Sequence, residues 1–184
     1  MKKTTEKITI GKKKFDAELL WTEKKDRPKL KKLYKAWVEL KNGLKEFESR
    51  APNLPEGISE GAFSLEFDCP RVLDVRGTAA SYDCYNTKTH ERIQIKATTI
   101  RYDLTSFGPD SVWDTLYLLD FYRDGKFDGK YDVYKIPNDL IYNHQISKTQ
   151  TFRDQQKQKR RPRFGIKKSI IEMHDIKPLR TCKI

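Results

Sequence analysis

The most regular pattern of apolar positions lies in the N-terminal third of the chain. Apolar side chains recur there at steps of three and four residues, which is the spacing of one face of an α-helix. They are Leu30, Leu33, Trp37, Leu40, Leu44 and Phe47. Asp26, Arg27 and Pro28 come just before them, and proline suits the first turn of a helix. The pattern predicts an amphipathic helix from about residue 27 to about residue 50, with a lysine-rich outer face.

A second helix is expected over residues 51–67. The segment opens with the turn residues of "APNLPEG" and continues with a mixture of apolar and acidic positions. Glu56 and Glu60 are one helical turn apart and share a face with Phe63 and Phe67. The helix should therefore present two carboxylates on one side.

Short runs of β-branched and aromatic residues predict strands in the rest of the chain. A short edge strand or arm is expected within residues 1–16, a short strand or a loop at 71–77, and further strands at 80–85, 92–99, 114–122 and 131–136. Residues 137–144 should form a short helix. Helices followed by a mixed sheet of four or five strands predict an α/β (α+β) fold, with a mixed central β-sheet flanked by helices and an irregular basic tail.

The strand predicted at 92–99 has two different faces. Side chains two residues apart lie on the same side of a strand. Ile93, Ile95 and Ala97 should therefore point into the core. Gln94 and Lys96 should lie side by side on the other face.

Asp83 belongs to the strand predicted just before this one. If the two strands pair as a hairpin, its carboxylate approaches Gln94 and Lys96. Carboxylate and amide oxygens suit Mg²⁺, which keeps much of its water shell in proteins. A neighbouring lysine can orient one of those waters, or help to deprotonate it, for in-line attack on a phosphate. The alternative is that these polar side chains form the solvated face of an ordinary hairpin.

Composition and charge narrow the class of protein. The 184 residues include three Trp, nine Tyr and nine Phe, enough bulky side chains for the core of one compact domain, and the net charge is +12. Residues 1–50 hold 16 Lys and Arg against 8 Asp and Glu, residues 51–144 hold 10 against 15, and residues 145–184 hold 12 against 3. Basic ends around an acidic centre suit a protein that grips phosphates at its edges and binds a cation between them. Charges scattered over a soluble surface are the alternative.

The sequence carries no sign of a membrane or secretory protein. No apolar run approaches the ~20 residues of a membrane span, and the basic N-terminus is not followed by the apolar segment of a signal peptide. Cys69, Cys84 and Cys182 match no disulfide or zinc framework. These features favour a cytoplasmic protein with no membrane partner.

The segment "SYDCYNTKTHERIQIK" resembles the core motif of the PD-(D/E)XK nucleases, in which an Asp on one strand is followed on the next by an acidic residue, any residue and a Lys. Asp83 takes the first position and Lys96 the last, whereas Gln94 stands where most members have Glu or Asp. The motif thus has the variant form D…QxK. "LPEGISEGAF" resembles the glutamate-bearing helix before the core of many small type II restriction endonucleases, and "TSFGPDSVWDTLYLLDF" followed by "YDVYKIP" resembles the strand-turn-strand after it.

This resemblance covers roughly residues 50–140, and it implies a restriction-endonuclease-like core. It also implies Mg²⁺-dependent cleavage of double-stranded DNA at a short palindromic site by a homodimer. A companion DNA methyltransferase would be present in the cell, though not as a bound subunit. The chain would be a single nuclease domain over residues 1–184, with a basic arm and helix at 1–50, a catalytic core at 51–144 and a basic DNA-binding tail at 145–184.

The glutamine leaves the expected site one negative charge short. Glu60 is expected to join Asp83 and Gln94 as a metal ligand, with Glu56 as the second choice. Asp74 is an alternative to Asp83 as the leading acid, although its separation from Gln94 along the chain fits a hairpin less well. The expected catalytic residues are Asp83, Gln94, Lys96 and Glu60.

Candidate DNA contacts lie in two segments. Arginine commonly reads guanine and Asn or Gln reads adenine, whereas other basic side chains contact phosphates and position the duplex. Such side chains are concentrated in "RDQQKQKRRPRF", and the loop "TSFGPDS" offers a second contact after the catalytic strands. The expected DNA-binding residues are Ser106, Arg153, Lys157, Lys159, Arg160, Arg161 and Arg163.

Two other functions remain open from the residues alone. A structure-selective DNA repair nuclease or junction resolvase of the same superfamily would use the same site. A non-catalytic nucleic-acid-binding protein would need only the basic ends, but the acidic centre argues against it. A type II restriction endonuclease is the leading hypothesis.

Overall fold

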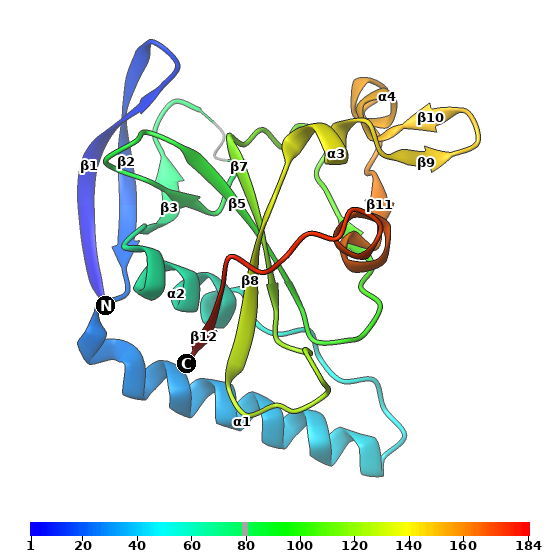
Figure 1. Ribbon diagram of the computed structural model, residues 1–184. Helices are drawn as coiled ribbons and strands as arrows, with labels where there is room; N and C mark the ends of the chain where they lie inside the picture. The colour runs from blue at the N-terminus through cyan, green and yellow to red at the C-terminus, as the bar shows by residue number, and fades with distance from the viewer. Residues whose placement is uncertain (79–80) are drawn as a thin grey trace.

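The computed structural model describes residues 1–78 and 81–184. Within these residues the chain builds one large mixed sheet of eight strands in the order β1-β2-β3-β4-β5-β7-β8-β12 (Figure 1). In this described sheet β5 and β7 run parallel, and the other neighbouring strands are antiparallel. The strands are β1 (Lys2–Ile10), β2 (Lys13–Trp21), β3 (Arg71–Val75), β4 (Cys84–Tyr85), β5 (Arg92–Thr98), β7 (Thr115–Asp120), β8 (Lys130–Ile136) and β12 (Arg180–Lys183).

Two long helices, α1 (Arg27–Glu46) and α2 (Glu56–Phe67), cover one face of this sheet (Figure 1). A single turn of 3₁₀-helix, η1 (Lys24–Asp26), leads into α1. Tyr34 and Trp37 of α1 pack in one cluster with Phe63 of α2 and with Ile93 and Leu119 of the sheet. The helix pattern read from the sequence is therefore confirmed, although α1 ends at Glu46 rather than near residue 50.

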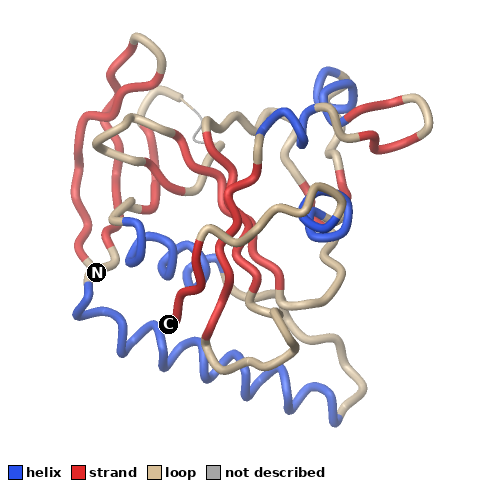
Figure 2. Tube along the Cα trace, viewed as in Figure 1, coloured by secondary structure: helices blue, strands red, loops and turns tan. Residues whose placement is uncertain are grey.

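The opposite face is covered by short helical segments from the last third of the chain. Leu116 and Leu118 of β7 point to this side, because they alternate with Leu119, and they pack against Phe107 and Phe152. Figure 2 shows these short helices gathered on the right, well away from α1 and α2. They are α3 (Asn138–Tyr142), α4 (Phe152–Lys157) and the π-helix η2 (Lys167–Glu172).

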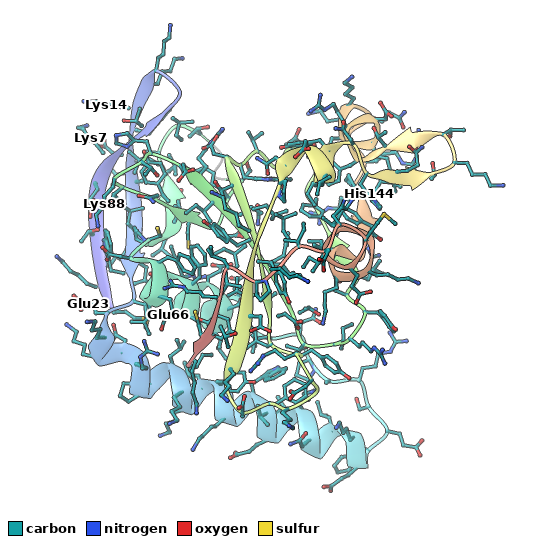
Figure 3. All side chains as sticks on the ribbon, viewed as in Figure 1. Lys7, Lys14, Glu23, Glu66, Lys88 and His144 are labelled. Atoms are coloured by element: carbon teal, nitrogen blue, oxygen red, sulfur yellow. The ribbon has the colours of Figure 1, made fainter. Side chains whose placement is uncertain are left out.

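The N-terminal segment is a long antiparallel hairpin of β1 and β2, which turns at Gly11. Gly11 has φ of +60°, a conformation that glycine adopts without steric cost. Ile8 and Leu19 of the hairpin pack with Val75 and Tyr85 in a third apolar cluster. β1 is the edge strand expected within residues 1–16, but it is nine residues long and pairs with β2, which the sequence did not predict. The prediction of four or five strands was wrong. The side chains of Lys7 and Lys14 extend from this hairpin, far across the molecule from His144 (Figure 3).

Residues 145–184 are folded, so the prediction of an irregular tail was also wrong. Besides α4 and η2 the segment contains the hairpin β9 (Gln145–Ser147) and β10 (Gln150–Thr151), and β11 (Arg163–Phe164), which pairs with β6 (Thr105–Ser106). Its last strand, β12, extends the large sheet beside β8. Phe152, Phe164 and Ile170 anchor the segment in the core, but their irregular spacing gives no helical or strand period.

A buried carboxylate joins this C-terminal segment to the loop after β5. Asp103 accepts hydrogen bonds from Thr105 Oγ1 (2.7 Å) and from the backbone amides of Ile166 (2.8 Å) and Lys167 (2.9 Å). Gly165 permits the approach, because a Cβ atom there would lie 2.6 Å from the Asp103 carbonyl oxygen. The contacts hold β6 and β11 beside the end of β5.

The large mixed sheet with helices on both faces confirms the predicted α/β (α+β) class. Among the residues that the structure describes, no helix combines the length and the apolar character needed to cross a membrane.

Candidate functional site

A cleft of about 500 Å³ opens where β4 ends and β5 continues alone on that side. β4 pairs with β5 only at Cys84↔Ile93 and Tyr85↔Arg92, whereas β7 accompanies β5 on its other side from Ile93 to Thr98. Among the residues that the structure describes, no strand pairs with this edge of β5 beyond Ile93. The first turn of α2, the loop after β5, β6 and β11 form the remaining walls.

Asp83 lies immediately before β4, and its side chain takes the place of the missing strand. The backbone amide of Asp83 donates to the Ile93 carbonyl (2.9 Å), which fixes the residue against β5. Its Oδ2 atom then accepts from the backbone amide of Ile95 (2.6 Å) and from Nε2 of Gln94. The short β4 thus brings the carboxylate and the carboxamide together, as the sequence analysis expected of a hairpin.

The hydrogen bond to Asp83 also orients the Gln94 amide. Gln94 is 5% exposed, and its nitrogen is committed to Oδ2 of Asp83. Within the described residues, neither Gln94 Oε1 nor Asp83 Oδ1 accepts a hydrogen bond, and both residues line the cleft. Two hard oxygen atoms are therefore left for a ligand in the cleft.

Lys96 comes from the next position on the same face of β5 and also lines the cleft. Its Nζ atom lies 5.1 Å from the centroid of the Phe107 ring. Burial lowers the pKa of the Lys96 amine below its ordinary value, against the opposing effect of the Asp83 and Glu60 carboxylates. A lysine whose ammonium form is disfavoured in this way forms the neutral, proton-accepting amine more readily than a surface lysine does, so Lys96 is a candidate for proton transfer.

Glu60 reaches the cleft from α2, where its side chain is 13% exposed. Nε of Arg71 donates to Glu60 Oε2 at 2.6 Å. Burial and the nearby charge of Asp83 nevertheless raise the pKa of Glu60 to about 7, because Arg71 offsets these effects only in part. Glu56 also borders the cleft, but its side chain is 82% exposed and lies 4.0 Å from Arg71.

The positive charges near the cleft do not fully compensate its carboxylates. Burial raises the pKa of Asp83 as well, although the Ile95 amide and the charge of Lys96 act in the opposite direction. No group of three His, Cys, Asp or Glu residues able to hold a metal occurs in the described part of the chain. The donor set here has two carboxylates and the Gln94 amide oxygen, and such oxygen ligands fit a hard divalent ion that retains several waters.

One expectation about a neighbouring residue is wrong. Ala97 is exposed rather than buried, because the cleft opens beside it. Asp74, the alternative leading acid, lies on β3 opposite Glu18 and is exposed outside the cleft.

The candidate DNA-binding residues divide into two groups. Ser106 and Arg163 face each other across β6 and β11, and both line the cleft. Arg161 is two residues before Arg163, and its charge helps to lower the pKa of Lys96. Ser106 and Arg163 thus add a hydroxyl group and a positive charge to the wall of the cleft, and Arg161 is close enough to act on Lys96.

The other basic residues lie away from the cleft, on and around α4. Arg153 stacks over Tyr142 with 5.3 Å between the guanidinium carbon and the ring centroid. Lys159 pairs with Asp110, and Arg160 donates to Gln150 Oε1 (3.1 Å) on β10. Lys157 is the last residue of α4.

Sequence reasoning missed Arg71 and Asp103, which hold the walls of the cleft. Arg71 follows α2 and is the partner of Glu60, and Asp103 holds the wall that carries Ser106 and Arg163. An isolated charged residue next to a strand or loop carries no pattern.

Comparison with known proteins gives two consistent similarities. A profile of the family described as Bsp6I restriction endonuclease matches residues 22–173 of the chain. The type II restriction enzyme Bsp6I of Bacillus sp. (strain RFL6) is 39% identical over 165 residues, covering 83% of this chain and 88% of the relative. No solved structure matches the chain.

These similarities, on a mixed sheet with a carboxylate-lined cleft, define the class of protein as a restriction endonuclease, a site-specific hydrolase that acts on DNA. More narrowly, the chain belongs to the Bsp6I restriction endonuclease family. The matched region contains all four residues expected to be catalytic.

The raised pKa of Glu60 makes a prediction about stability. The pKa of Glu60 rises on folding from 4.5 to about 7. Between these pH values the folded state therefore binds more protons than the unfolded state. The free energy of unfolding consequently falls as the pH rises through this window. Glu60→Gln removes this loss. The free energy of unfolding is measured in urea with EDTA for the variant and for the natural protein. The difference between the two, in favour of Glu60→Gln, should grow by on the order of 3 kcal/mol as the pH rises from 4.5 to 8.

The control is Glu56→Gln, which changes an 82% exposed carboxylate one turn earlier on α2. Its unfolding curve should follow that of the natural protein at every pH. Parallel pH profiles for Glu60→Gln and the natural protein would contradict the prediction.

Proposed function

We propose that this restriction endonuclease is a Mg²⁺-dependent homodimer that hydrolyses both strands of DNA at a short palindromic site. The observation that carries the proposal is the convergence of Asp83, Gln94, Lys96 and Glu60 in one cleft, beside Arg163. The arrangement matches the D…QxK motif and the glutamate-bearing helix expected from the sequence. The Bacillus relative is a type II restriction enzyme, which supports the same proposal.

Asp83 Oδ1, Gln94 Oε1 and the Glu60 carboxylate would hold the metal. When bound, a divalent ion lowers the pKa of coordinated water and offsets charge on the phosphate. Gln94 contributes a ligand atom without adding a third buried negative charge, so Asp83 and Glu60 remain the charged ligands. Glu60 can lose its proton near neutral pH, because its pKa is about 7.

Lys96 is proposed to orient the attacking water and to accept its proton. Burial in the cleft disfavours the ammonium form, so a neutral amine is accessible at lower cost than on the surface. The water oxygen bonds to phosphorus as the bond to the leaving oxygen breaks. Arg161, Arg163 and Ser106 would bind the phosphate groups around this point.

The basic residues outside the cleft would extend the contact along the duplex. Arg153, Lys157, Lys159 and Arg160 lie on or near α4, and the polar hairpin of β9 and β10 projects beside them (Figure 1). A twofold-symmetric enzyme reads a palindrome, because the symmetry of the protein is repeated in the DNA. A companion methyltransferase would protect the site in the cell, and the buried free thiols are compatible with the cytoplasm.

Loss of Asp83 or Lys96 should abolish cleavage but leave DNA binding intact. Asp83→Ala removes a metal ligand, and Lys96→Ala removes the proton acceptor, so each rate of plasmid cleavage in Mg²⁺ should fall by about 10²–10⁴. Binding of a duplex in Ca²⁺ should remain. Discrete fragments from the natural protein indicate site-specific cutting, and a smear would indicate a structure-selective or non-specific nuclease.

Asp74→Ala is the matched control, because Asp74 is an exposed carboxylate of the same sheet outside the cleft. It should cut at the natural rate. Unimpaired cutting by Asp83→Ala or by Lys96→Ala would remove the proposed site.

Gln94→Glu should shift metal affinity rather than destroy activity. The new carboxylate would face Oδ2 of Asp83, where the amide now donates a hydrogen bond. Like charges in a buried position destabilise the metal-free protein and favour a bound cation. Calorimetric titration should show tighter Mg²⁺ binding, and the melting temperature should be lower in EDTA and rise further on adding Mg²⁺ than in the natural protein. Complete loss of metal binding would refute the role of Gln94 as a ligand.

Point variants test the basic segment better than truncation, since removal of residues 153–184 would also delete core residues such as Ile170 and the strand β12. Arg161→Ala and Arg163→Ala should each reduce the slope of log K against log salt by about 1, because each removes a phosphate contact. Lys177→Ala is the control, because Lys177 pairs with Asp175 and does not line the cleft. If the slope is unchanged in all three variants, the DNA phosphates must be bound by other residues.

A further inference from the structure

A second cavity, of about 520 Å³, lies on the other side of the α2 N-terminus from the catalytic cleft. It is a groove between α1 and the segment that leads into α2. Its walls are almost entirely apolar and include Leu33, Ala36 and Leu40 of α1 and Pro52 and Pro55 opposite. Nothing in the described residues fills this groove.

The outer side of α1 continues the apolar surface of the groove. Leu33, Leu40 and Phe47 are 48%, 54% and 80% exposed. They are seven residues apart, so they form one stripe along about 20 Å of helix. The core uses a different side of α1, which carries Leu30 and Tyr34. In Figure 1 α1 forms the lower border of the molecule, with no element beyond it. An exposed apolar stripe beside an apolar groove is typical of a protein interface.

The charges along α1 indicate that the partner is another copy of the same helix in the opposite direction. Residues 27–38 contain Arg27, Lys29, Lys31, Lys32 and Lys35 and no acid, whereas residues 39–48 contain three Glu and two Lys. Antiparallel packing brings the basic half of one helix to the half of the other that carries the glutamates, and it also opposes the helix dipoles. A parallel arrangement would place the two basic halves together.

The surface has the form that a twofold interface needs. The same patch must serve both copies, so it must offer ridges as well as hollows. Leu33 and Leu40 form ridges beside the groove, and Gly43 has no neighbour within 4 Å of where its Cβ would lie, which leaves room for a partner side chain. We propose that the stripe and groove of α1 form the dimer interface of this enzyme, an inference that rests on the proposed homodimer.

This interface would adjoin the active site. Gly57 and Ile58 line the groove, and the neighbouring Ser59 and Glu60 line the cleft. Arg71 lines the groove and also donates to the Glu60 carboxylate. A partner seated in the groove therefore lies one side chain away from a candidate metal ligand. The two clefts of the dimer would stand beside a common interface, as cutting both strands of one site requires.

The test compares two substitutions that add the same charge to α1. Leu40 and Asn42 are both exposed and point to nearly opposite sides of the helix, since each residue turns it by 100°. Leu40→Glu places a carboxylate in the stripe of both copies and should weaken the dimer, measured by sedimentation equilibrium without metal or DNA, at least about tenfold. Asn42→Glu should leave the dimer constant unchanged, and circular dichroism should show both variants folded.

A crosslink tests the geometry independently. Leu40 is the middle residue of the stripe, so in antiparallel packing it lies close to its equivalent on the partner. Leu40→Cys should form a disulfide-linked dimer under mild oxidation, whereas Asn42→Cys should not. Cys69, Cys84 and Cys182 are buried, so a crosslink reports the introduced thiol.

Each outcome has a separate meaning. A natural protein that is dimeric, with a Leu40→Glu variant that is equally dimeric and a Leu40→Cys variant that does not crosslink, would overturn the interface and leave the proposed homodimer standing. A natural protein that is monomeric alone and on DNA would overturn the homodimer and leave the groove to another occupant. Because the mass measurement needs no catalysis, neither result depends on whether the protein cuts DNA.

Discussion

The hydrogen bonds from the Ile95 amide and the Gln94 carboxamide to Asp83 Oδ2 determine the form of the candidate site. A strand whose neighbour ends early leaves backbone amides unpaired, and an unpaired buried amide is costly. The Asp83 carboxylate satisfies the amide of Ile95 and so allows β4 to stop at two residues. The cleft exists because β4 stops there. The Asp83 side chain thus accepts the hydrogen bond of the Ile95 amide with Oδ2 and leaves Oδ1 for a ligand.

The same arrangement leaves the site short of positive charge, which would favour the binding of a cation. Asp83 and Glu60 are brought together out of bulk water, and the pKa values of both carboxyl groups are raised by burial. Arg71 and Lys96 compensate this charge in part, and Lys96 is itself disfavoured as an ammonium ion. In this setting a glutamine at position 94 is physically reasonable, because a third carboxylate against Asp83 would raise the cost of the metal-free fold. The amide keeps the ligand atom and turns repulsion into a hydrogen bond.

The sequence predicted the parts of the structure that have a regular period, and it failed where stability comes from scattered contacts. The spacing of Leu30 and Trp37 predicted α1, and the alternation in "RIQIK" put Gln94 and Lys96 on one face of β5. Ala97 follows the same alternation but is exposed. Alternation shows on which side of a strand a residue lies, but not whether another element covers that side.

The C-terminal segment appeared irregular because its charges dominate the pattern, while Phe152, Phe164 and Ile170 anchor it at uneven intervals. The Glu60–Arg71 pair depends on how α2 and β3 meet in space. Glu60 was expected from the resemblance and from the negative charge that Gln94 leaves missing, whereas Arg71 was not expected at all.

Arg71 shows how the surface and the chemistry of this protein are joined. It lies on β3, pairs with Glu60 in the cleft and forms part of the apolar groove on the opposite side of the α2 N-terminus. Contact with the apolar walls would bury the stem of Arg71 and reduce the water around its guanidinium, which strengthens its attraction for Glu60. A partner in the groove would thereby favour the ionised carboxylate that a metal requires. Dimer formation and the ionisation of Glu60 would then be coupled through the guanidinium group of Arg71, with no movement of the backbone.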